Sequence, residues 1–277
     1  MKIGAIIQAR LSSTRFSEKV LRKLPYNSDI TVLEQVIRRV KKSKLIDEIV
    51  IATTTNEEDL KIVEVARKED VSYSRGSLSN VLERYYNAAV SNDLDIIIRI
   101  TSDCPCIDFE IIDDVIKNHL DSNADYTSNS FDESFIHGVD VEVINFAALE
   151  KSFKEAIHSY EREHVTPFIY KSNPNQFIIN SYINKKINNE NIRITLDTAK
   201  DYALLCSIYD YLYEKDEYFS LNDIINLFNE KPWLKLINED IIQKKIYNSL
   251  DEELEEAIRI LDMQDLNYTK EFIEKQL

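Results

Sequence analysis

Strands and helices alternate along most of the chain, and this alternation constrains the fold more than any other feature of the sequence. Apolar runs that end in polar residues predict strands at residues 1–8, 47–55, 71–73, 95–101, 124–128, 137–144, 176–183 and 191–198. Runs with helical periodicity separate them, at residues 31–43, 57–68, 79–91, 108–121, 145–157, 160–171 and 199–215. This order is typical of right-handed crossover units, which build a mostly parallel sheet with helices on both faces.

The alternation ends near residue 220 and divides the chain into two predicted parts. We expect residues 1–220 to form one α/β domain. Residues 221–277 are acidic and have a helical pattern, with Trp233 in the segment KPWLKLIN. No linker or repeat separates them from the domain, so we expect a helical extension that packs on it and does not fold independently. An extension of this kind needs a surface to cover, which favours a homodimer.

The composition excludes several classes of function. The formal net charge is −15 and the pI is near 4.8, so the chain repels phosphate backbones and nucleic acid is not an expected partner. No apolar run approaches the ~18 residues that a membrane span needs, and no cleavable hydrophobic segment precedes the first strand. We therefore expect a cytoplasmic protein without membrane insertion. Cys104, Cys106 and Cys206 are too irregularly spaced for a disulfide framework or a zinc site.

A short basic loop follows the first predicted strand. Its cations are Arg10, Arg15 and Lys19, and its hydroxyl residues are Ser12, Ser13, Thr14 and Ser17. Guanidinium groups bind phosphate oxygens in bidentate fashion, and small hydroxyl residues add neutral donors, so the loop is suited to a polyphosphate. A solvated surface loop is the alternative.

Two further polar clusters end predicted strands, SRGS at 74–77 and TSDCP at 101–105. In a parallel sheet the ligand lies beyond the carboxyl ends of the strands, so we expect these clusters to lie near the basic loop. Asp103 directly follows an apolar strand, and Asp197 ends the predicted strand at 191–198. Magnesium is typically held by one or two carboxylates together with substrate phosphates, which makes these two aspartates candidate ligands. A turn or helix-cap role is the alternative for Asp103.

Two later segments carry weaker signals. Asp140 and Glu142 share one face of the strand predicted at 137–144, where they could bind a sugar or a metal or simply form a solvated face. Arg162 and His164 lie two residues apart on a predicted helix, so their side chains diverge unless the helix start is irregular. They could recognise an anion or serve only the structure.

Six motifs, taken in order, point to a known family. They are IIQARLSSTRFSEKVL (6–21), RGSLSNVLERYYNAA (75–89), RITSDCPCID (99–108), HGVDVEV (137–143), REHVTP (162–167) and RITLDTAKDY (193–202). Together they resemble the cytidylyltransferase family that includes the spore coat polysaccharide biosynthesis protein F group, which is related to the synthetases of CMP-activated acidic sugars. The resemblance runs over about residues 1–240.

This resemblance implies a fold and a reaction. The fold would be a Rossmann-like nucleotidyltransferase domain of the nucleotide-diphospho-sugar transferase type, a three-layer α/β sandwich with a mostly parallel sheet. In the reaction, a sugar-type acceptor attacks the α-phosphorus of a nucleoside triphosphate, usually CTP, and releases pyrophosphate with the help of Mg²⁺. No side chain need act as a nucleophile, because positioning and charge neutralisation provide most of the catalysis.

The resemblance also assigns roles to matching residues. Arg10, Arg15 and Lys19 would bind the triphosphate and promote transfer. The wider nucleotide site would comprise Ala9, Arg10, Ser13, Arg15, Lys19, Gly76, Ser77, Asn80, Arg84, Thr101 and Asp103. Asp103 and Asp197 would ligate Mg²⁺. The residues facing the acceptor would be Asp140, Glu142, Arg162 and His164. The chain departs from the family pattern at Ser17 and Glu18, where Pro-Gly is common, at Asn80 and at Ala199.

The leading hypothesis is therefore a Mg²⁺-dependent cytidylyltransferase that makes a precursor of a surface polysaccharide or capsule. A glycosyltransferase that uses a nucleotide sugar is the first alternative, although the D-x-D pair typical of that class is missing from SDC at 102–104. A nucleotide-binding scaffold without catalysis is the second, motivated by Glu18 and the acidic tail. The acceptor stays open among sugar acids, phosphorylated sugars or polyols, and small phosphorylated metabolites.

Overall fold

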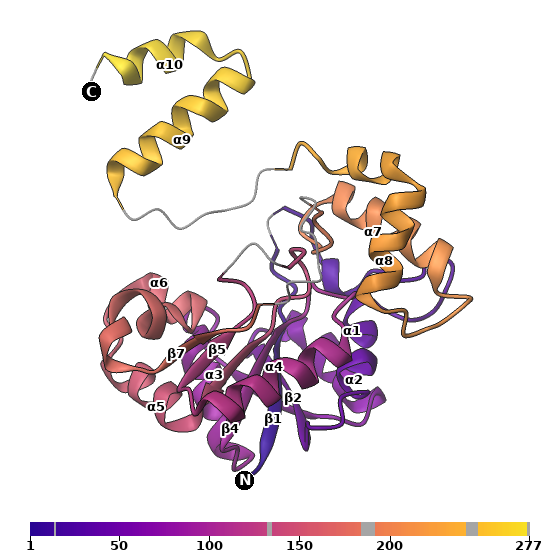
Figure 1. The fold of residues 1–277 in the computed structure, drawn as a ribbon, viewed down its shortest axis with the longest axis vertical. Coiled ribbons are helices and arrows are strands. Elements are labelled where there is room, and N and C mark those ends of the chain that lie inside the picture. Colours follow the sequence, from indigo (N-terminus) through magenta and orange to yellow (C-terminus); the bar gives the residue numbers. More distant parts are fainter. Residues whose placement is uncertain (14, 132–134, 184–191, 242–248, 276–277) are drawn as a thin grey trace. The chain divides into compact units, whose positions relative to one another are not determined.

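The computed structural model contains one seven-stranded sheet with helices on both of its faces (Figure 1). It describes residues 1–13, 15–131, 135–183, 192–241 and 249–275, so Thr14 of the basic loop and Asn191 of the last predicted strand lie outside the described residues. The strand order is β3-β2-β1-β4-β6-β5-β7. The strands are β1 Ile3–Gln8, β2 Glu48–Thr54, β3 Ser72–Gly76, β4 Ile96–Thr101, β5 Tyr126–Ser128, β6 Glu142–Asn145 and β7 Ile179–Ser181.

The helices follow the predicted alternation closely. The α-helices are α1 Val32–Val40, α2 Leu60–Lys68, α3 Val81–Ser91, α4 Phe109–Ser122, α5 Phe146–Glu155, α6 Ser159–His164, α7 Ala199–Leu212, α8 Leu221–Glu230, α9 Leu250–Met263 and α10 Asn267–Glu274. Shorter helical turns are η1 Lys19–Leu21, η2 Glu57–Asp59, η3 Phe168–Ser172, η4 Pro174–Gln176 and η5 Pro232–Ile237.

The sheet is mostly parallel, as predicted, and only β6 runs antiparallel to its neighbours β4 and β5. The chain lays β2 and β3 on one side of β1 and then places β4 on the other side. The strand order therefore reverses between β1 and β4. In open α/β sheets, ligands bind beyond the carboxyl ends of the strands at such a reversal.

The core has two layers, one on each face of the sheet. Ile7, Ile51 and Ile98 lie on the face that α1, α2, α4, α7 and α8 cover, and all three are completely buried. Ile6, Val50 and Ile97 lie on the other face, together with side chains of α3 and α5. Successive residues of each strand thus face opposite layers, and both layers exclude water. The three-layer α/β sandwich expected from the sequence is confirmed.

One predicted strand is wrong. Residues 192–198 form no strand and contribute a single bridge, between His137 and Arg193. The segment is held instead by contacts at the ends of other elements: the Ile194 N–H donates to the His137 carbonyl over 2.8 Å, and the Leu196 N–H donates to the Asp103 carbonyl over 2.8 Å. These two bonds replace a regular ladder. Asp197 therefore comes from a loop that leads into α7.

The helix predicted at 160–171 is interrupted. Helix α6 ends at His164, and Val165 takes a φ of 74°. The Thr166 N–H donates to the His164 carbonyl over 2.9 Å, which closes a tight three-residue turn. The chain then continues as the π-helical turn η3. A β-branched residue at positive φ is rare and strained, so the surrounding structure must hold this turn in place.

Residues 1–239 and residues 240–277 form two separate compact units. The first includes α8 and η5, so it extends beyond the domain boundary expected at residue 220. The second contains α9 and α10, which contact each other and contain no buried residue. Whether this unit packs on the first, as expected from the sequence, stays a prediction. Across the described part of the chain, no helix is long and apolar enough to span a membrane.

Candidate nucleotide and metal site

The basic loop is anchored at its start by a buried aspartate of η2. The Leu11 N–H donates to Asp59 Oδ1 over 2.8 Å, and the Thr54 hydroxyl at the end of β2 also donates to Asp59. Leu11 is itself buried. A fully buried carboxylate with two donors fixes the point at which the chain leaves β1, because an unsatisfied buried charge would be costly. The loop therefore starts from a rigid base.

Glu18 stands in the left-handed backbone region, with φ 51° and ψ 28°. Glycine adopts this conformation without strain, which explains why a glycine suits the position before the lysine. The Glu18 carboxylate forms an ion pair with Lys61 of α2 at 2.6 Å, and this bond lowers the pKa of Glu18. The extra anion of this loop is thus already paired with a cation outside the candidate site.

Lys19 joins three segments of the chain. Its Nζ donates to Asp103 Oδ2 over 2.8 Å, to Asp197 Oδ1 over 2.9 Å and to the Leu196 carbonyl over 2.7 Å. Burial acts to lower the pKa of Lys19, but the two carboxylates outweigh it and the pKa is raised. The ammonium therefore stays charged, and it fixes two aspartates from distant parts of the chain around one positive charge.

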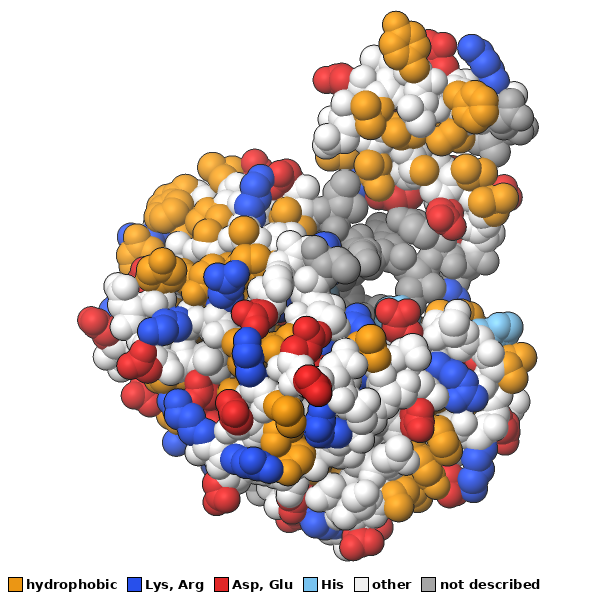
Figure 2. Space-filling view, turned by 180° about the vertical axis from the view of Figure 1, so that it is seen from behind, with side chains coloured by type: hydrophobic (Ala, Val, Ile, Leu, Met, Phe, Trp, Pro, Cys, Tyr) orange, Lys and Arg blue, Asp and Glu red, His pale blue; other side chains and the backbone are white. Residues whose placement is uncertain are grey.

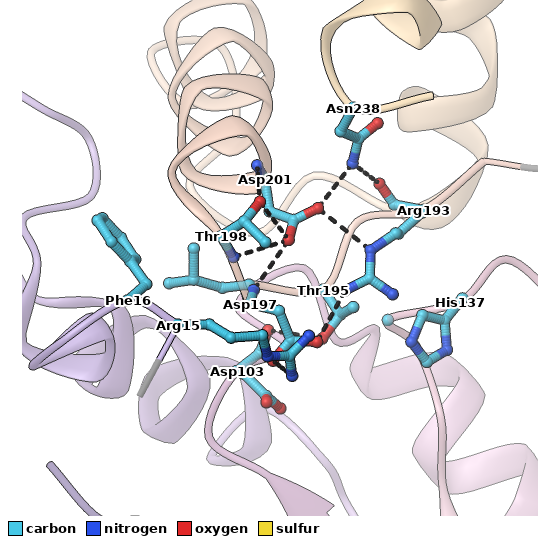
Figure 3. Close-up of polar contacts among 12 residues, drawn as sticks. Arg15, Phe16, Asp103, His137, Arg193, Thr195, Asp197, Thr198, Asp201 and Asn238 are labelled. Atoms are coloured by element: carbon cyan, nitrogen blue, oxygen red, sulfur yellow. Dashed lines mark hydrogen bonds and ion pairs between the residues drawn. The ribbon is translucent and has the colours of Figure 1, made fainter. Parts of the chain in front are cut away.

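Two arginines complete the environment of Asp197 (Figure 3). Arg15 reaches Oδ1 at 2.9 Å, and Arg193 reaches Oδ2 at 2.7 Å. Burial acts to raise the pKa of Asp197, but the charges and hydrogen bonds of Lys19 and Arg193, with the charge of Arg15, lower it to about 2. Burial likewise opposes ionisation of Asp103, yet Lys19 and a hydrogen bond from Thr101 keep its pKa below the usual value. Both carboxylates are therefore ionised at neutral pH.

The donor set suits a hard divalent cation. Asp103 and Asp197 already converge on one cationic group, and both offer carboxylate oxygens. Within the described residues, no group of three or more His, Cys, Asp or Glu could hold a metal. Two carboxylates are nevertheless the usual protein contribution to a Mg²⁺ site, where phosphates and waters supply the other ligands. The two residues predicted as ligands thus fit Mg²⁺.

The other residues predicted in the first loop lie at its edges. Arg10 is exposed and forms no hydrogen bond or ion pair with another described residue. Ala9 is buried, and its N–H donates to the Ala52 carbonyl over 3.2 Å. Ser13 closes a turn by donating its N–H to the Leu11 carbonyl over 2.7 Å. Of these three, Arg10 presents an exposed cationic side chain that could meet an anion.

The second predicted nucleotide loop is braced by Arg84 of α3. Arg84 is buried, and its guanidinium donates to the carbonyls of Ser77 and Leu78. Gly76 leaves room for it, because a Cβ at Gly76 would lie 3.0 Å from Arg84 Cγ and the side chain would have to shift. Asn80 caps α3 by accepting from the Glu83 N–H over 3.1 Å. Arg84 and Asn80 thus shape the loop, and their predicted nucleotide contacts stay predictions.

The two carboxylates predicted to face the acceptor do not share a strand face. Asp140 lies in the loop before β6 and accepts from the Gly138 N–H over 3.1 Å. Glu142 is the first residue of β6, is buried, and pairs with Arg99 of β4 at 2.7 Å. The Tyr126 hydroxyl also donates to Glu142, over 3.0 Å. Glu142 is thus part of a buried polar cluster, whereas Asp140 is half-exposed.

The predicted anion-recognition pair on α6 is divided. Arg162 donates to the Ala156 carbonyl over 2.6 Å and so ties the start of α6 to the end of α5. His164 is exposed and provides the carbonyl of the tight turn at Val165. The side chain of Thr166, just after that turn, donates to Glu142 over 3.3 Å. The roles of Arg162 and His164 toward an acceptor stay predictions.

Sequence reasoning missed two groups of this site. Arg193 pairs with Asp197 four residues later in the motif RITLDTAKDY, but residues 192–198 form no helix, so the spacing alone did not indicate this pair. Asn238 donates to Asp201, which also pairs with Arg193. Asn238 and Asp201 lie 37 residues apart, so no local sequence pattern connects them.

A separate depression lies away from these residues. It has a volume of about 830 Å³ and lies at the amino ends of β2 and β3, where Glu48, Ser72 and Tyr73 line it. The candidate site is at the opposite, carboxyl ends of the strands. Glu48, which lines this depression, forms an ion pair with Lys2 at the start of β1 and so holds the two strand ends together.

Comparison with known proteins agrees with this geometry. A family profile described as cytidylyltransferase matches residues 4–241. An uncharacterized protein of Methanocaldococcus jannaschii is 41% identical over 259 residues, which cover 91% of this chain and 100% of that protein. The spore coat polysaccharide biosynthesis protein SpsF of Bacillus subtilis is 31% identical over 244 residues, covering 82% of this chain and 94% of that protein.

A solved structure gives the same result. The cytidylyltransferase from Leptospira borgpetersenii serovar Hardjo-bovis superposes with a TM-score of 0.78 at 34% identity, covering 90% of this chain and 100% of that chain. The matched segments contain every residue of the cluster around Lys19, because the family profile spans residues 4–241. Profile, relatives and structure agree that this chain belongs to the cytidylyltransferase family.

Proposed function

We propose that the protein transfers CMP from CTP to a sugar acid or a phosphorylated sugar or polyol and releases pyrophosphate, with Mg²⁺ as its cofactor. The product would be a precursor of a surface polysaccharide or capsule. Family membership supports the transfer of a cytidylyl group, and the name of the Bacillus subtilis relative supports the polysaccharide context. The expected homodimer and cytoplasmic location stay predictions.

One observation carries this proposal. The Lys19 ammonium lies within 2.9 Å of carboxylate oxygens from both Asp103 and Asp197, and Arg15 meets the same oxygen of Asp197. A basic loop after the first strand and two carboxylates from distant segments therefore meet at the carboxyl edge of the sheet. Nucleotidyl transfer needs a group that binds the phosphates and a group that holds the metal, at the same place.

The charge of each residue determines its role in this reaction. Lys19, Arg15 and the exposed Arg10 would bind the β- and γ-phosphates and hold the α-phosphorus in line with the acceptor. Asp103 and Asp197 would hold Mg²⁺, which neutralises charge on the triphosphate. An acceptor oxygen forms a bond to the α-phosphorus, and the bond to the oxygen that bridges to the β-phosphorus breaks. The electron pair leaves with pyrophosphate, and a hydroxyl acceptor releases its proton to solvent.

The test is a pyrophosphate-release assay with CTP, Mg²⁺ and a panel of sugar acids and of phosphorylated sugars and polyols. We expect turnover with at least one acceptor and a loss of about 100-fold or more in kcat for Asp103→Asn. Asp29→Asn is the matched control, because Asp29 is an exposed carboxylate that pairs with Lys23 at the surface. Release of a nucleoside diphosphate from a nucleotide sugar, or full turnover of Asp103→Asn, would refute the proposal.

A further inference from the structure

Asn238 ties the end of the first unit to the segment that carries Asp197 (Figure 3). It follows η5 and is 5% exposed. Its Nδ2 donates to Asp201 Oδ1 over 2.8 Å and to the Arg193 carbonyl over 3.1 Å. One side-chain amide thus contacts both the loop before Asp197 and the first turn of α7.

Asp201 is the residue through which this contact reaches the site. It is 1% exposed and uses both of its oxygens. Oδ2 accepts from the N–H of Asp197 over 3.0 Å, and from the N–H and the hydroxyl of Thr198 over 2.9 and 3.0 Å. These bonds fix the backbone of Asp197 and start α7. The Thr198 hydroxyl accepts in return from the Asp201 N–H, which makes a capping box.

Arg193 is shared between the two aspartates. Its Nε reaches Asp201 Oδ1 at 3.2 Å, and its Nη2 reaches Asp197 Oδ2 at 2.7 Å. Asp201 Oδ1 therefore has two donors, Arg193 and Asn238. A buried carboxylate oxygen that loses one of its two donors forms a closer hydrogen bond with the remaining donor, because an unsatisfied buried charge is costly. Removing Asn238 would draw the guanidinium toward Asp201 and away from Asp197.

We infer that Asn238 is a positioning residue that sets where Asp197 places its carboxylate in the nucleotide and metal site. It acts through Asp201 and Arg193 and does not touch the nucleotide. The inference rests on the proposed function, because it names the support of a metal ligand in that site. Groups that orient a metal ligand typically account for about 10- to 100-fold in metal affinity or activity.

The test measures the binding of CTP by calorimetry as the Mg²⁺ concentration is varied. In Asn238→Ala, we expect half-maximal binding to need about 10-fold more Mg²⁺ than in the unmodified chain. The KM for the acceptor should not change, because Asn238 acts on the metal side of the site. Asn238→Asp keeps the size of the side chain but sets a carboxylate against Asp201, so its shift should be at least as large.

Leu234→Ala is the control for a purely structural role. Leu234 lies in η5 and is completely buried, so its truncation loosens the same segment without removing a hydrogen bond to Asp201. It should lower the melting temperature and leave the Mg²⁺ dependence unchanged. The inference would be overturned if Leu234→Ala raised the Mg²⁺ requirement for CTP binding equally, or if Asn238→Ala left that requirement unchanged. Asn238 would then have a purely structural role.

The outcome for the proposed function can be read separately. An unmodified chain that binds CTP with Mg²⁺ but releases no pyrophosphate with any acceptor refutes the proposed function, while the binding titration still decides the role of Asn238. An unmodified chain that binds no CTP at any Mg²⁺ concentration refutes both.

Discussion

The three cations of the basic loop differ in how many contacts each makes with the folded chain. Lys19 is committed to three oxygen atoms, and Arg15 to one. Arg10 is exposed and has no hydrogen bond or ion pair with any other residue that the structure describes. The same loop thus contains a cation that organises the site and a cation whose removal breaks nothing in the folded chain.

We therefore expect Arg10→Ala to separate binding from stability. The KM for CTP should rise about 10- to 100-fold, because one charge-assisted contact to phosphate is lost. The urea midpoint should not move. Steady-state kinetics and urea unfolding measure the two quantities. Arg67→Ala is the control, since Arg67 is an exposed arginine of α2 that contacts Tyr73. An equal effect of both variants on KM would show that only overall charge matters.

Gly138 is the glycine that the fold cannot replace. Its φ is 116°, and a Cβ there would lie 2.7 Å from the Ile194 carbonyl carbon and 2.8 Å from the Thr195 nitrogen. These are backbone atoms of the segment that leads to Asp197, so they cannot move aside without moving the site. At Gly76 the atom nearest to the added Cβ would be Arg84 Cγ, a side-chain atom at 3.0 Å.

Gly138→Ala should therefore lower the free energy of unfolding by roughly 2 kcal/mol or more, from backbone strain and from the clash. Gly76→Ala should cost less, because a side chain can shift by a few tenths of an ångström. Urea unfolding of the two variants gives the comparison. Equal losses would mean that the close approach of Ile194 does not constrain Gly138.

At the scale of elements, a buried histidine joins α4 to the sheet. His119 of α4 is hydrogen-bonded to the Thr127 hydroxyl of β5 at 2.9 Å and to Asn145 Oδ1 of β6 at 3.1 Å. Burial lowers the pKa of His119 from its usual value near 6.5, and the opposing effects of Asn145 and the Asp125 charge do not restore it. The neutral ring is therefore the form that holds these three elements together.

This lowered pKa makes stability depend on pH. The unfolded chain binds a proton at His119 near pH 6.5, while the folded chain resists it, so the unfolded state binds more protons below that pH. The free energy of unfolding should thus fall as pH drops below about 6.5, until the pH passes the pKa of the folded state. Urea unfolding between about pH 7.5 and 5 measures the slope. His119→Gln should show a shallower slope, and an unchanged slope would exclude His119 as its source.

The sequence predicted the central elements well, for a physical reason. Strands β1, β2 and β4 are buried on both faces, so they appear as continuous apolar runs. The strand prediction for residues 192–198 was wrong because this apolar segment is held by single backbone hydrogen bonds to the carbonyls of His137 and Asp103, and it forms no ladder. The break in the helix at 160–171 had a signal in Pro167, which disfavours a helical conformation at the residue before it.

Part of the site could also be predicted from the sequence, because strand ends indicate where a ligand lies. The expected meeting of Arg15, Lys19 and Asp103 followed from the rule that parallel strands end at one edge of the sheet. Asp197 was expected there at the end of a strand, and it reaches Lys19 from a loop instead. Glu142 was expected either to face the acceptor or to lie on a solvated strand face, and the structure pairs it with Arg99 inside the domain. That pairing depends on the antiparallel register of β6 with β4, which the sequence of β6 alone does not contain.

At the scale of the whole molecule, the second unit is too small to be stable alone. Domains below about 40 residues usually need disulfides, metals or a partner chain. Leu250, Met263, Leu266, Tyr268 and Phe272 of this unit are exposed, and Figure 2 shows hydrophobic side chains on its surface. The helices α9 and α10 therefore need a further surface on which to pack.

We expect a second copy of the chain to provide this surface. Light scattering at micromolar concentration should give the mass of a homodimer, and a chain that ends at residue 241 should give a monomer, because hydrophobic burial drives the association. The shortened chain keeps Asn238, so its affinity for CTP with Mg²⁺ should match that of the full chain. A monomeric full-length chain would refute the expected dimer.

The place of β1 in the sheet has a consequence for how the protein is made. The strand comes first in the chain but lies between β2 and β4, and its partner on one side ends at Thr101. At about 5–20 residues per second, a ribosome needs roughly 5–20 s to synthesise both neighbours of β1. During that interval this buried, apolar strand has an open edge, and a chaperone can bind it there.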